Sequence, residues 1–246
     1  MLPKKLILFL VTISFSTSSW ALQAFDWTSS NIQYLYGGDF IFAEQERSTV
    51  TIEHAHGWKY GTNFFFVDMY NNNGFEVYTE VYSYLSINKI FGADLSLGPI
   101  KDFSLAGGIN ISNRPEEKRF QAYLVGISLD LANEYFDYLQ LDVMAYKDDG
   151  YHSWGVQITP VWSFPFKLGP TKLKFRGFVD IKDGNTNALG NVTMLAQPQL
   201  LLDVGHLAGW KSDIFYIGTE YSFWLNKFGV EDANESAWQG MIIGFF

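Results

Sequence analysis

The chain has 246 residues, enough for one barrel-sized domain or two small ones. It contains no cysteine, which excludes disulfides, thiolate catalysis and cysteine-ligated metal sites. Aromatic residues make up 18% and charged residues only 17%, and the net charge of −9 disfavours binding to nucleic acid or to an anionic membrane surface.

The N-terminus has the features of a secretory signal peptide. Lys4 and Lys5 form a positive region, an apolar run follows from Leu6 to Ile13, and Ser19 and Ala21 fit the small-x-small cleavage rule. The alternative, a short membrane anchor, is disfavoured because the run is too short to span a bilayer. We therefore expect residues 1–21 to be a cleaved signal peptide and residues 22–246 to form the mature domain.

No later stretch holds some 18 consecutive apolar residues, so we expect no transmembrane helix. Residues 75–87 instead alternate with period two, which predicts a strand with one apolar and one polar face. The polar face carries two carboxylates and three tyrosines: Glu76, Tyr78, Glu80, Tyr82 and Tyr84.

Similar runs recur along the chain, and most are about ten residues long, the length that a tilted strand needs to cross a membrane. Soluble sandwich strands are nearer five or six residues. We predict twelve strands, at 31–42, 48–57, 60–69, 75–87, 102–112, 119–131, 136–147, 152–165, 171–182, 193–204, 213–225 and 237–246. Pro160 and Pro198 fall inside two of them, and each suggests a bulge.

The connections divide consistently between two ends of the sheet. If the chain starts in the periplasm, the acidic and asparagine-rich connections at 71–74, 113–118, 147–151, 183–192 and 226–236 all fall on one side. The turns near 57–60, 132–135, 165–170 and 205–212, and the 88–102 crossover, fall on the other. The pattern predicts an all-β, transmembrane antiparallel barrel, since only a closed sheet satisfies every backbone group in lipid.

The chain ends in "WQGMIIGFF", and its terminal Phe246 is typical of outer-membrane barrels rather than of an ordinary edge strand. We expect aromatic residues near strand ends to form the interfacial girdles of the membrane. These are Tyr34, Trp58, Phe75, Phe103, Trp154, Trp162, Trp238 and Phe246. The predicted location is the outer membrane of a Gram-negative bacterium.

In such a barrel the polar faces line a narrow lumen. Aromatic rings can stack on a flat solute, carboxylates and amides can exchange hydrogen bonds with hydroxyls, and an acidic wall repels phosphate. A nucleoside fits this chemistry and a nucleotide does not, although stacked aromatics also serve sugars. The predicted lining residues are Glu76, Tyr78, Glu80, Tyr82, Tyr84, Asn110, Asp142, Tyr146, Arg176, Phe178, Asp180, Glu220 and Trp224.

One segment carries a family resemblance. Residues 81–110, "VYSYLSINKIFGADLSLGPIKDFSLAGGIN", are similar to the nucleoside-specific outer-membrane channels of the Tsx and OmpK group, chiefly through "SINK" and "DLSLGPIKDF". The resemblance implies a twelve-stranded monomer that passes nucleosides by facilitated diffusion, with an acid at Glu80 and an aromatic at Phe178. The chain departs from the family at Gln157 and Thr159, where family members carry basic residues, and its outer loops are short.

The resemblance also implies partners: outer-membrane lipids, the barrel assembly machinery, and phages that use the outer loops as receptors. We expect no cofactor and no nucleic-acid partner. His54 and His56 lack a third ligand in the sequence pattern, so we expect no metal site and assign them to the surface or a girdle.

Two alternatives remain. A structural or receptor barrel would have its lumen closed by Lys174, Arg176 and Asp180, paired with acids such as Glu76, Glu80, Asp130, Asp142 or Glu220. An outer-membrane phospholipase would carry a serine and a histidine on the lipid face. His152 adjoins Ser153, but neighbours in a strand point to opposite faces, and we expect no serine to meet a histidine at cross-strand register. The sequence therefore predicts that the protein is not an enzyme.

Overall fold

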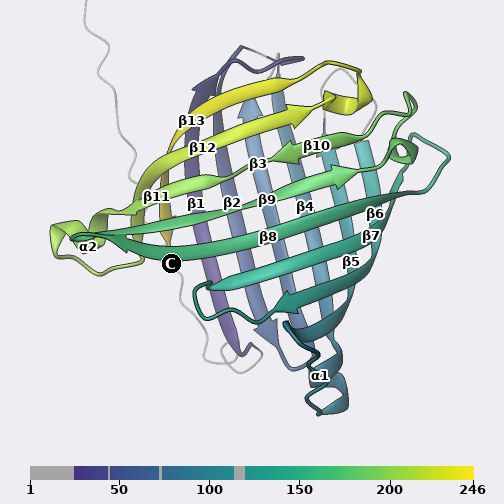
Figure 1. Ribbon diagram of the computed structural model, residues 1–246. Helices are drawn as coiled ribbons and strands as arrows, with labels where there is room; N and C mark the ends of the chain where they lie inside the picture. Colours follow the sequence, from purple (N-terminus) through teal and green to yellow (C-terminus); the bar gives the residue numbers. More distant parts are fainter. Residues whose placement is uncertain (1–24, 44, 72–73, 114–119) are drawn as a thin grey trace, which may run out of the picture.

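In the computed structural model, which describes residues 25–43, 45–71, 74–113 and 120–246, the chain forms one antiparallel sheet (Figure 1). Its strands are β1 (Trp27–Gly38), β2 (Glu46–Trp58), β3 (Gly61–Asn71), β4 (Phe75–Ser86), β5 (Ile100–Asn113), β6 (Phe120–Leu131), β7 (Tyr138–Asp148), β8 (Gly155–Leu168), β9 (Thr171–Lys182), β10 (Thr193–Ala196), β11 (Gln199–Asp203), β12 (Phe215–Leu225) and β13 (Glu235–Phe245). Two short helices, α1 (Ile87–Phe91) and α2 (Val204–Ala208), and two 3₁₀ turns, η2 (Gly184–Thr186) and η3 (Lys227–Gly229), lie in connections. Within these residues, no helix is both long and apolar enough to cross a membrane.

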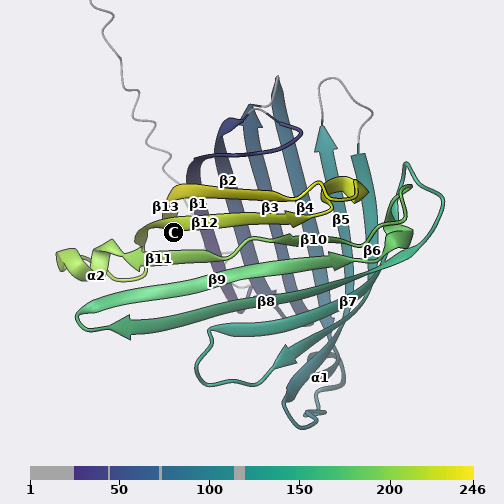
Figure 2. The same cartoon turned by 45° about the horizontal axis from the view of Figure 1, so that its top comes forward.

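The sheet closes into a barrel because the first and last strands pair, with Asn31 of β1 opposite Phe245 of β13. Strands β10 and β11 share one position between β9 and β12, so the barrel has twelve strand positions. In Figures 1 and 2, β8, β9 and β11–β13 cross in front of β1–β5, as tilted strands on two opposite walls do. The predicted all-β twelve-strand barrel is confirmed.

Alternation along each strand separates an apolar outside from a polar inside. In β1, Asn31, Gln33 and Leu35 are buried, whereas Ile32 and Tyr34 are about half exposed. This distribution of apolar and polar residues is the inverse of that in a soluble protein, because the exposed face is the one that meets lipid.

The two ends of the barrel differ. Because strands alternate in direction, α1, α2 and the end of β13 lie at the same rim, which we call the α1/α2 rim (Figure 2). It corresponds to the predicted periplasmic side.

The predictions for the end of the first strand and for the two prolines differ from the structure. The first strand ends at Gly38 rather than at residue 42, because Asp39 and Phe42 have φ of 67° and 58°, which leave the extended region. Pro160 causes no bulge: the β8–β9 pairs are interrupted beside it but keep one register, Ile158 with Ile181 and Val161 with Phe178.

Pro198 does divide its strand into β10 and β11, again without a register change. The predicted signal peptide at 1–21 and residues 114–118 of the predicted turn at 113–118 lie outside the described residues.

Candidate functional site

A wall of tyrosines and acids lines the bore on β4. Glu76, Glu80 and Tyr82 are buried inside the barrel, and the half-buried Tyr78 and Tyr84 lie on the same face of the strand. The Glu80 carboxylate accepts hydrogen bonds from the Tyr78 hydroxyl, from the Tyr82 hydroxyl at 2.9 Å and from Asn110 Nδ2 at 2.9 Å. We call Tyr78, Tyr82 and Tyr84 the tyrosine wall.

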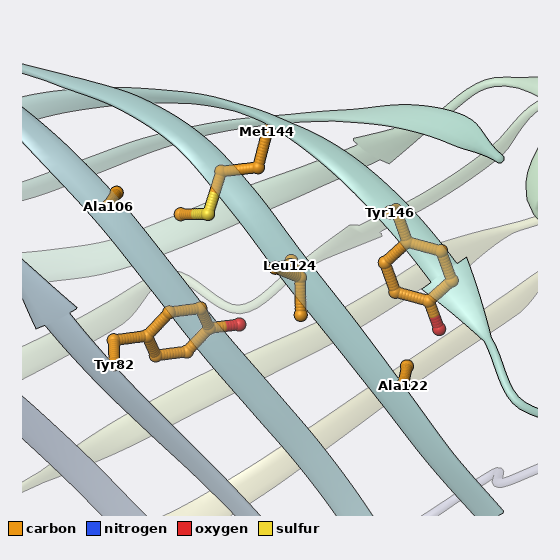
Figure 3. Packing of buried hydrophobic residues seen from close by; sticks show 6 residues of the cluster. All are labelled: Tyr82, Ala106, Ala122, Leu124, Met144 and Tyr146. Atoms are coloured by element: carbon orange, nitrogen blue, oxygen red, sulfur yellow. The ribbon is translucent and has the colours of Figure 1, made fainter.

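The rings of the tyrosine wall are held in fixed orientations. Tyr82 and Tyr84 lie nearly parallel, with ring centroids 6.3 Å apart and planes 20° apart. The Tyr84 hydroxyl donates to Asp142 Oδ2 at 2.9 Å and so links β4 to β7 inside the bore. Figure 3 shows Tyr82 and Tyr146 on either side of Leu124, in one buried cluster that also holds Met144 and the small residues Ala106 and Ala122.

A glycine makes room for one of these rings. A Cβ atom at Gly108, which faces Tyr82 across β4 and β5, would lie 2.5 Å from the Tyr82 ring carbons. The absence of a side chain at Gly108 therefore allows the Tyr82 ring to lie against the inner face of β5.

The neighbouring strand β3 adds inward residues that the sequence analysis missed. Phe64, Phe66 and Asp68 pair with Tyr82, Glu80 and Tyr78 respectively, so they share the inward face. Phe66 and Tyr78 are in ring contact, with centroids 6.0 Å apart. Three consecutive phenylalanines hide the period-two signal in this strand.

The opposite wall carries amides around an acid. Glu220 of β12 accepts hydrogen bonds from Gln197 Nε2 at 3.3 Å, from Gln199 Nε2 at 2.8 Å and from Gln239 Nε2 at 2.8 Å. Glu220 is among the predicted lining residues but these glutamines are not, although Gln199 and Gln239 alternate inward on β11 and β13; Gln197 lies in the break between β10 and β11.

An ion pair joins strands β2 and β9 across the bore. Arg176 Nη2 on β9 lies 2.5 Å from Glu53 Oε2 on β2, and Glu53 also accepts from Asn31 Nδ2 at 2.8 Å. The acids proposed from the sequence as partners of Arg176 do not include Glu53, so that prediction is corrected. Likewise, Lys174 pairs with Asp137 at 3.2 Å and not with the acids proposed for it.

The remaining predicted lining residues also face the bore. Asp180 accepts from Gln157 Nε2 at 3.0 Å and from Thr159 Oγ1 at 2.7 Å. Lys182 Nζ lies 4.7 Å from the Tyr146 ring centroid. Phe178 lies on the inward face of β9, and Trp224 contacts Phe228 near the rim opposite α1 and α2.

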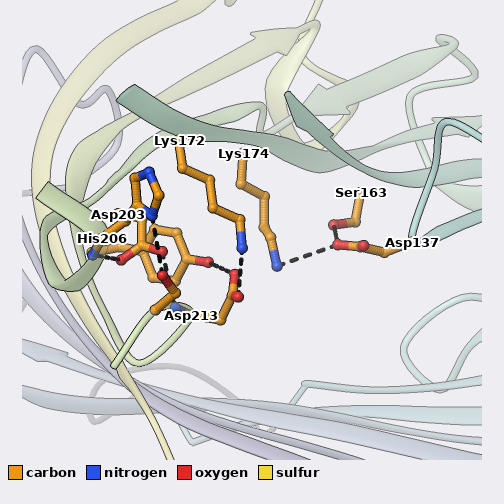
Figure 4. A network of polar contacts seen from close by, with 9 residues as sticks. Asp137, Ser163, Lys172, Lys174, Asp203, His206 and Asp213 are labelled. Carbon is orange, nitrogen blue, oxygen red and sulfur yellow. Dashed lines mark hydrogen bonds and ion pairs between the residues drawn. The ribbon is translucent and has the colours of Figure 1, made fainter. Parts of the chain in front are cut away.

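A second polar network lies at the α1/α2 rim (Figure 4). Lys172 Nζ lies 2.5 Å from Asp213 Oδ2, and the Tyr216 hydroxyl donates to Asp213 Oδ1 at 2.6 Å. Asp203 accepts from the backbone amides of His206 and Asp213, both at 2.9 Å. Partial burial raises the pKa of Asp213, but the hydrogen bonds from Lys172 and Tyr216 outweigh it and hold this pKa below its usual value.

The outer face carries a serine–histidine pair that the sequence analysis did not expect. Ser30 and His54 face each other across β1 and β2, with Ser30 Oγ 2.7 Å from His54 Nδ1. His54 Nε2 lies 3.1 Å from His56 Nδ1, and Asn63 Nδ2 lies 2.9 Å from His56 Nε2. The expectation that no such pair exists was therefore wrong.

The donor-to-acceptor order of the hydrogen bonds from Asn63 through His56 and His54 to Ser30 opposes nucleophilic catalysis. An amide nitrogen only donates, so His56 Nε2 accepts from Asn63, and neutral imidazoles then donate in turn to His54 and to Ser30 Oγ. A general base would have to accept the serine proton instead. In the part of the chain that the structure describes, no group of three or more His, Cys, Asp or Glu residues could hold a metal ion.

Solved porins share this fold. The KdgM porin in complex with disordered oligogalacturonate has a TM-score of 0.50 and 10% identity, and the match covers 88% of this chain and 99% of that chain. The NanC porin has a TM-score of 0.50 and 11% identity, and covers 89% and 100% respectively. At such identity the likeness shows the fold alone, a closed antiparallel barrel of twelve strand positions.

Family membership rests on the sequence. Among curated proteins, none matches this chain. The family described as "Domain of unknown function (DUF5020)" matches residues 29–238, which is most of the barrel. The chain therefore belongs to the DUF5020 family.

Proposed function

We propose that the protein is a passive outer-membrane channel whose solutes are nucleosides. The observation that carries the proposal is the parallel pair Tyr82 and Tyr84, whose hydroxyls are held by Glu80, Asn110 and Asp142. Held in this way, the rings offer flat faces to a base at little cost in side-chain entropy. Base–aromatic stacking contributes about 1–3 kcal/mol per base, which suits a solute that must bind weakly and leave again.

The polar residues favour a neutral solute. Carboxylates from Glu53, Glu80, Asp142, Asp180 and Glu220 reach the bore from several strands, and the basic Arg176 is already paired with Glu53. An anionic sugar such as the oligogalacturonate bound by KdgM would meet these acids, as would a nucleotide phosphate. The similarity of residues 81–110 to nucleoside-specific channels supports the same solute class.

Two other functions have less support. A closed, structural barrel would need the Arg176–Glu53 pair to block passage permanently, but both side chains keep some exposure, at 12% and 17%. A lipid hydrolase would need Ser30 to donate to His54, and the hydrogen-bond direction set by Asn63 opposes this. We further propose a monomer in outer-membrane lipid, inserted by the barrel assembly machinery and open to phage attachment at its outer loops.

The proposal is tested by solute flux. Proteoliposomes that contain the purified barrel are given labelled uridine, uridine monophosphate or glucose. We expect uridine to enter fastest and the monophosphate slowest. Entry of all three at rates that depend only on their size would reduce the protein to a general pore, and no entry of any would support the closed barrel.

A further inference from the structure

Three inward residues form a row across adjacent strands on the amide-bearing wall. Gln199 of β11 pairs with Glu220 of β12, and Glu220 pairs with Gln239 of β13. All three side chains are buried within the barrel, at 7%, 6% and 2% exposure. The row faces the bore because its neighbours Leu200, Thr219 and Gly240 lie on the outer face.

The central carboxylate fixes the orientation of both amides. A carboxylate only accepts hydrogen bonds, so each glutamine must turn its NH₂ group toward Glu220, and both do so at 2.8 Å. The amide oxygens must then turn away from Glu220.

These oxygens are left without donors. Gln199 Oε1 and Gln239 Oε1 are both buried and have no hydrogen-bond partner among the described residues. The same arrangement recurs on β8, where Gln157 Nε2 donates to Asp180 and Gln157 Oε1 has no partner in the described parts of the chain. A buried acceptor that lacks a donor destabilises the protein, so these positions favour a ligand that brings one.

We propose that Gln199, Glu220 and Gln239 form a subsite for the hydroxyl groups of a neutral, sugar-like moiety, which for a nucleoside is the ribose. This inference rests on the proposed function and deepens it. Hydroxyls supply the missing donors, and Glu220 Oε2, which accepts from Gln199, can accept one further hydrogen bond from a hydroxyl. A phosphate offers chiefly acceptors, and Glu220 repels its charge.

The two walls then divide the recognition of one solute. The tyrosine wall takes the base by stacking, and the Gln199–Glu220–Gln239 subsite takes the sugar by hydrogen bonding. The two amide oxygens without donors therefore predict that the channel prefers nucleosides with ribose hydroxyls to nucleosides without them. Stacking alone cannot produce this preference, because a base stacks equally well in both.

The test compares current block by adenosine and by 2′,3′-dideoxyadenosine in single channels in planar bilayers. The variants are Gln199→Leu and Gln239→Leu, alone and combined. Gln197→Leu is the matched control, because Gln197 donates to the same Glu220 at 3.3 Å but its oxygen is not one of the buried acceptors without a partner. Current block by free ribose at high concentration is measured in the same channels.

We expect adenosine to block the natural channel at about fivefold lower concentration than dideoxyadenosine, as one or two hydrogen bonds allow. The double variant should lose this preference while its block by dideoxyadenosine stays unchanged, and Gln197→Leu should keep it. Equal block by the two nucleosides in the natural channel, or a preference that survives in the double variant, would overturn the subsite.

The measurement with free ribose distinguishes failure of the subsite from failure of the proposed function. If neither nucleoside blocks the channel but ribose does, and the double variant abolishes that block, the hydroxyl subsite stands and the nucleoside function fails. If ribose and both nucleosides leave the current unchanged, both are overturned. Conductance without solute reports whether each variant has folded into an open barrel.

Discussion

Arg176 on β9 and Glu53 on β2 form an ion pair across the bore, with Nη2 and Oε2 2.5 Å apart. Their strands stand on nearly opposite walls, since β10–β13 and β1 lie between them on one side and β3–β8 on the other. The pair therefore divides the lumen at its level. A solute must pass beside this bridge or open it.

Arg176→Gln should raise single-channel conductance and increase cation preference, because it removes the bridge and leaves the Glu53 charge in the bore. Loss of one partner of a buried pair costs about 3 kcal/mol of stability, and the lumen exposure of this pair reduces that figure. Conductance, reversal potential and urea unfolding are the measurements.

The control for this variant is Lys101→Gln. Lys101 Nζ lies 3.8 Å from Asp130 in a pair whose lysine is 70% exposed, so its removal should change stability by less than about 1 kcal/mol. Unaltered conductance in Arg176→Gln would mean that the pair does not constrict the pathway.

Gly108→Ala should disturb the tyrosine wall, because its Cβ would lie 2.5 Å from the Tyr82 ring. We expect a loss of about 1–3 kcal/mol in stability and weaker nucleoside block. The adjacent Gly107→Ala is a matched control, since its Cβ meets only Leu124 O, at 3.9 Å. Equal effects of the two substitutions in urea unfolding and current block would refute the close packing of Tyr82.

Removing the rings directly should weaken block further. In the combined variant Tyr82→Ala and Tyr84→Ala, the loss of about 1–3 kcal/mol of stacking corresponds to roughly 5- to 150-fold in affinity. Tyr123→Ala, on the outer face, serves as the control and should have no effect. If block is retained in the double variant, the stacking site lies elsewhere.

The α1/α2 rim should loosen in acid. The pKa of Asp213 is lower in the folded protein than in the unfolded chain, so its stabilising effect is present above about pH 4 and is lost as pH falls through the folded pKa. Protection of the amides of residues 204–214, relative to their intrinsic exchange at each pH, should therefore fall below pH 4. Asp213→Asn should show the lower protection already at neutral pH. Protection in the variant that matches the natural protein at neutral pH would argue against this role.

Most of the fold is readable in the sequence because period-two alternation is a local property. The strand count, the closed barrel and the inward side of β4 all follow from it. The signal fails where composition masks the period, as in the run Phe64, Phe65 and Phe66 on β3. It also fails at strand ends: the first strand begins at Trp27, so Ser30 lies within it and meets His54, a pairing hidden by the expected start at residue 31.

The contacts inside the bore are harder to predict. Neighbouring strands pair in a register that alternation constrains, but Arg176 and Glu53 meet across the lumen, where tilt and stagger of the closed sheet decide which side chains reach each other. The contacts of Gln199 and Gln239 with Glu220 become visible only once the register of β11, β12 and β13 is known. The binding roles of the lining residues stay predictions.

The most direct measurement is single-channel conductance of the refolded barrel in a planar bilayer, with adenosine, glucose and adenosine monophosphate added in turn. We predict a small conductance that adenosine blocks and that glucose and the monophosphate hardly change. A channel blocked equally by all three, or a barrel with no conductance at all, would contradict it.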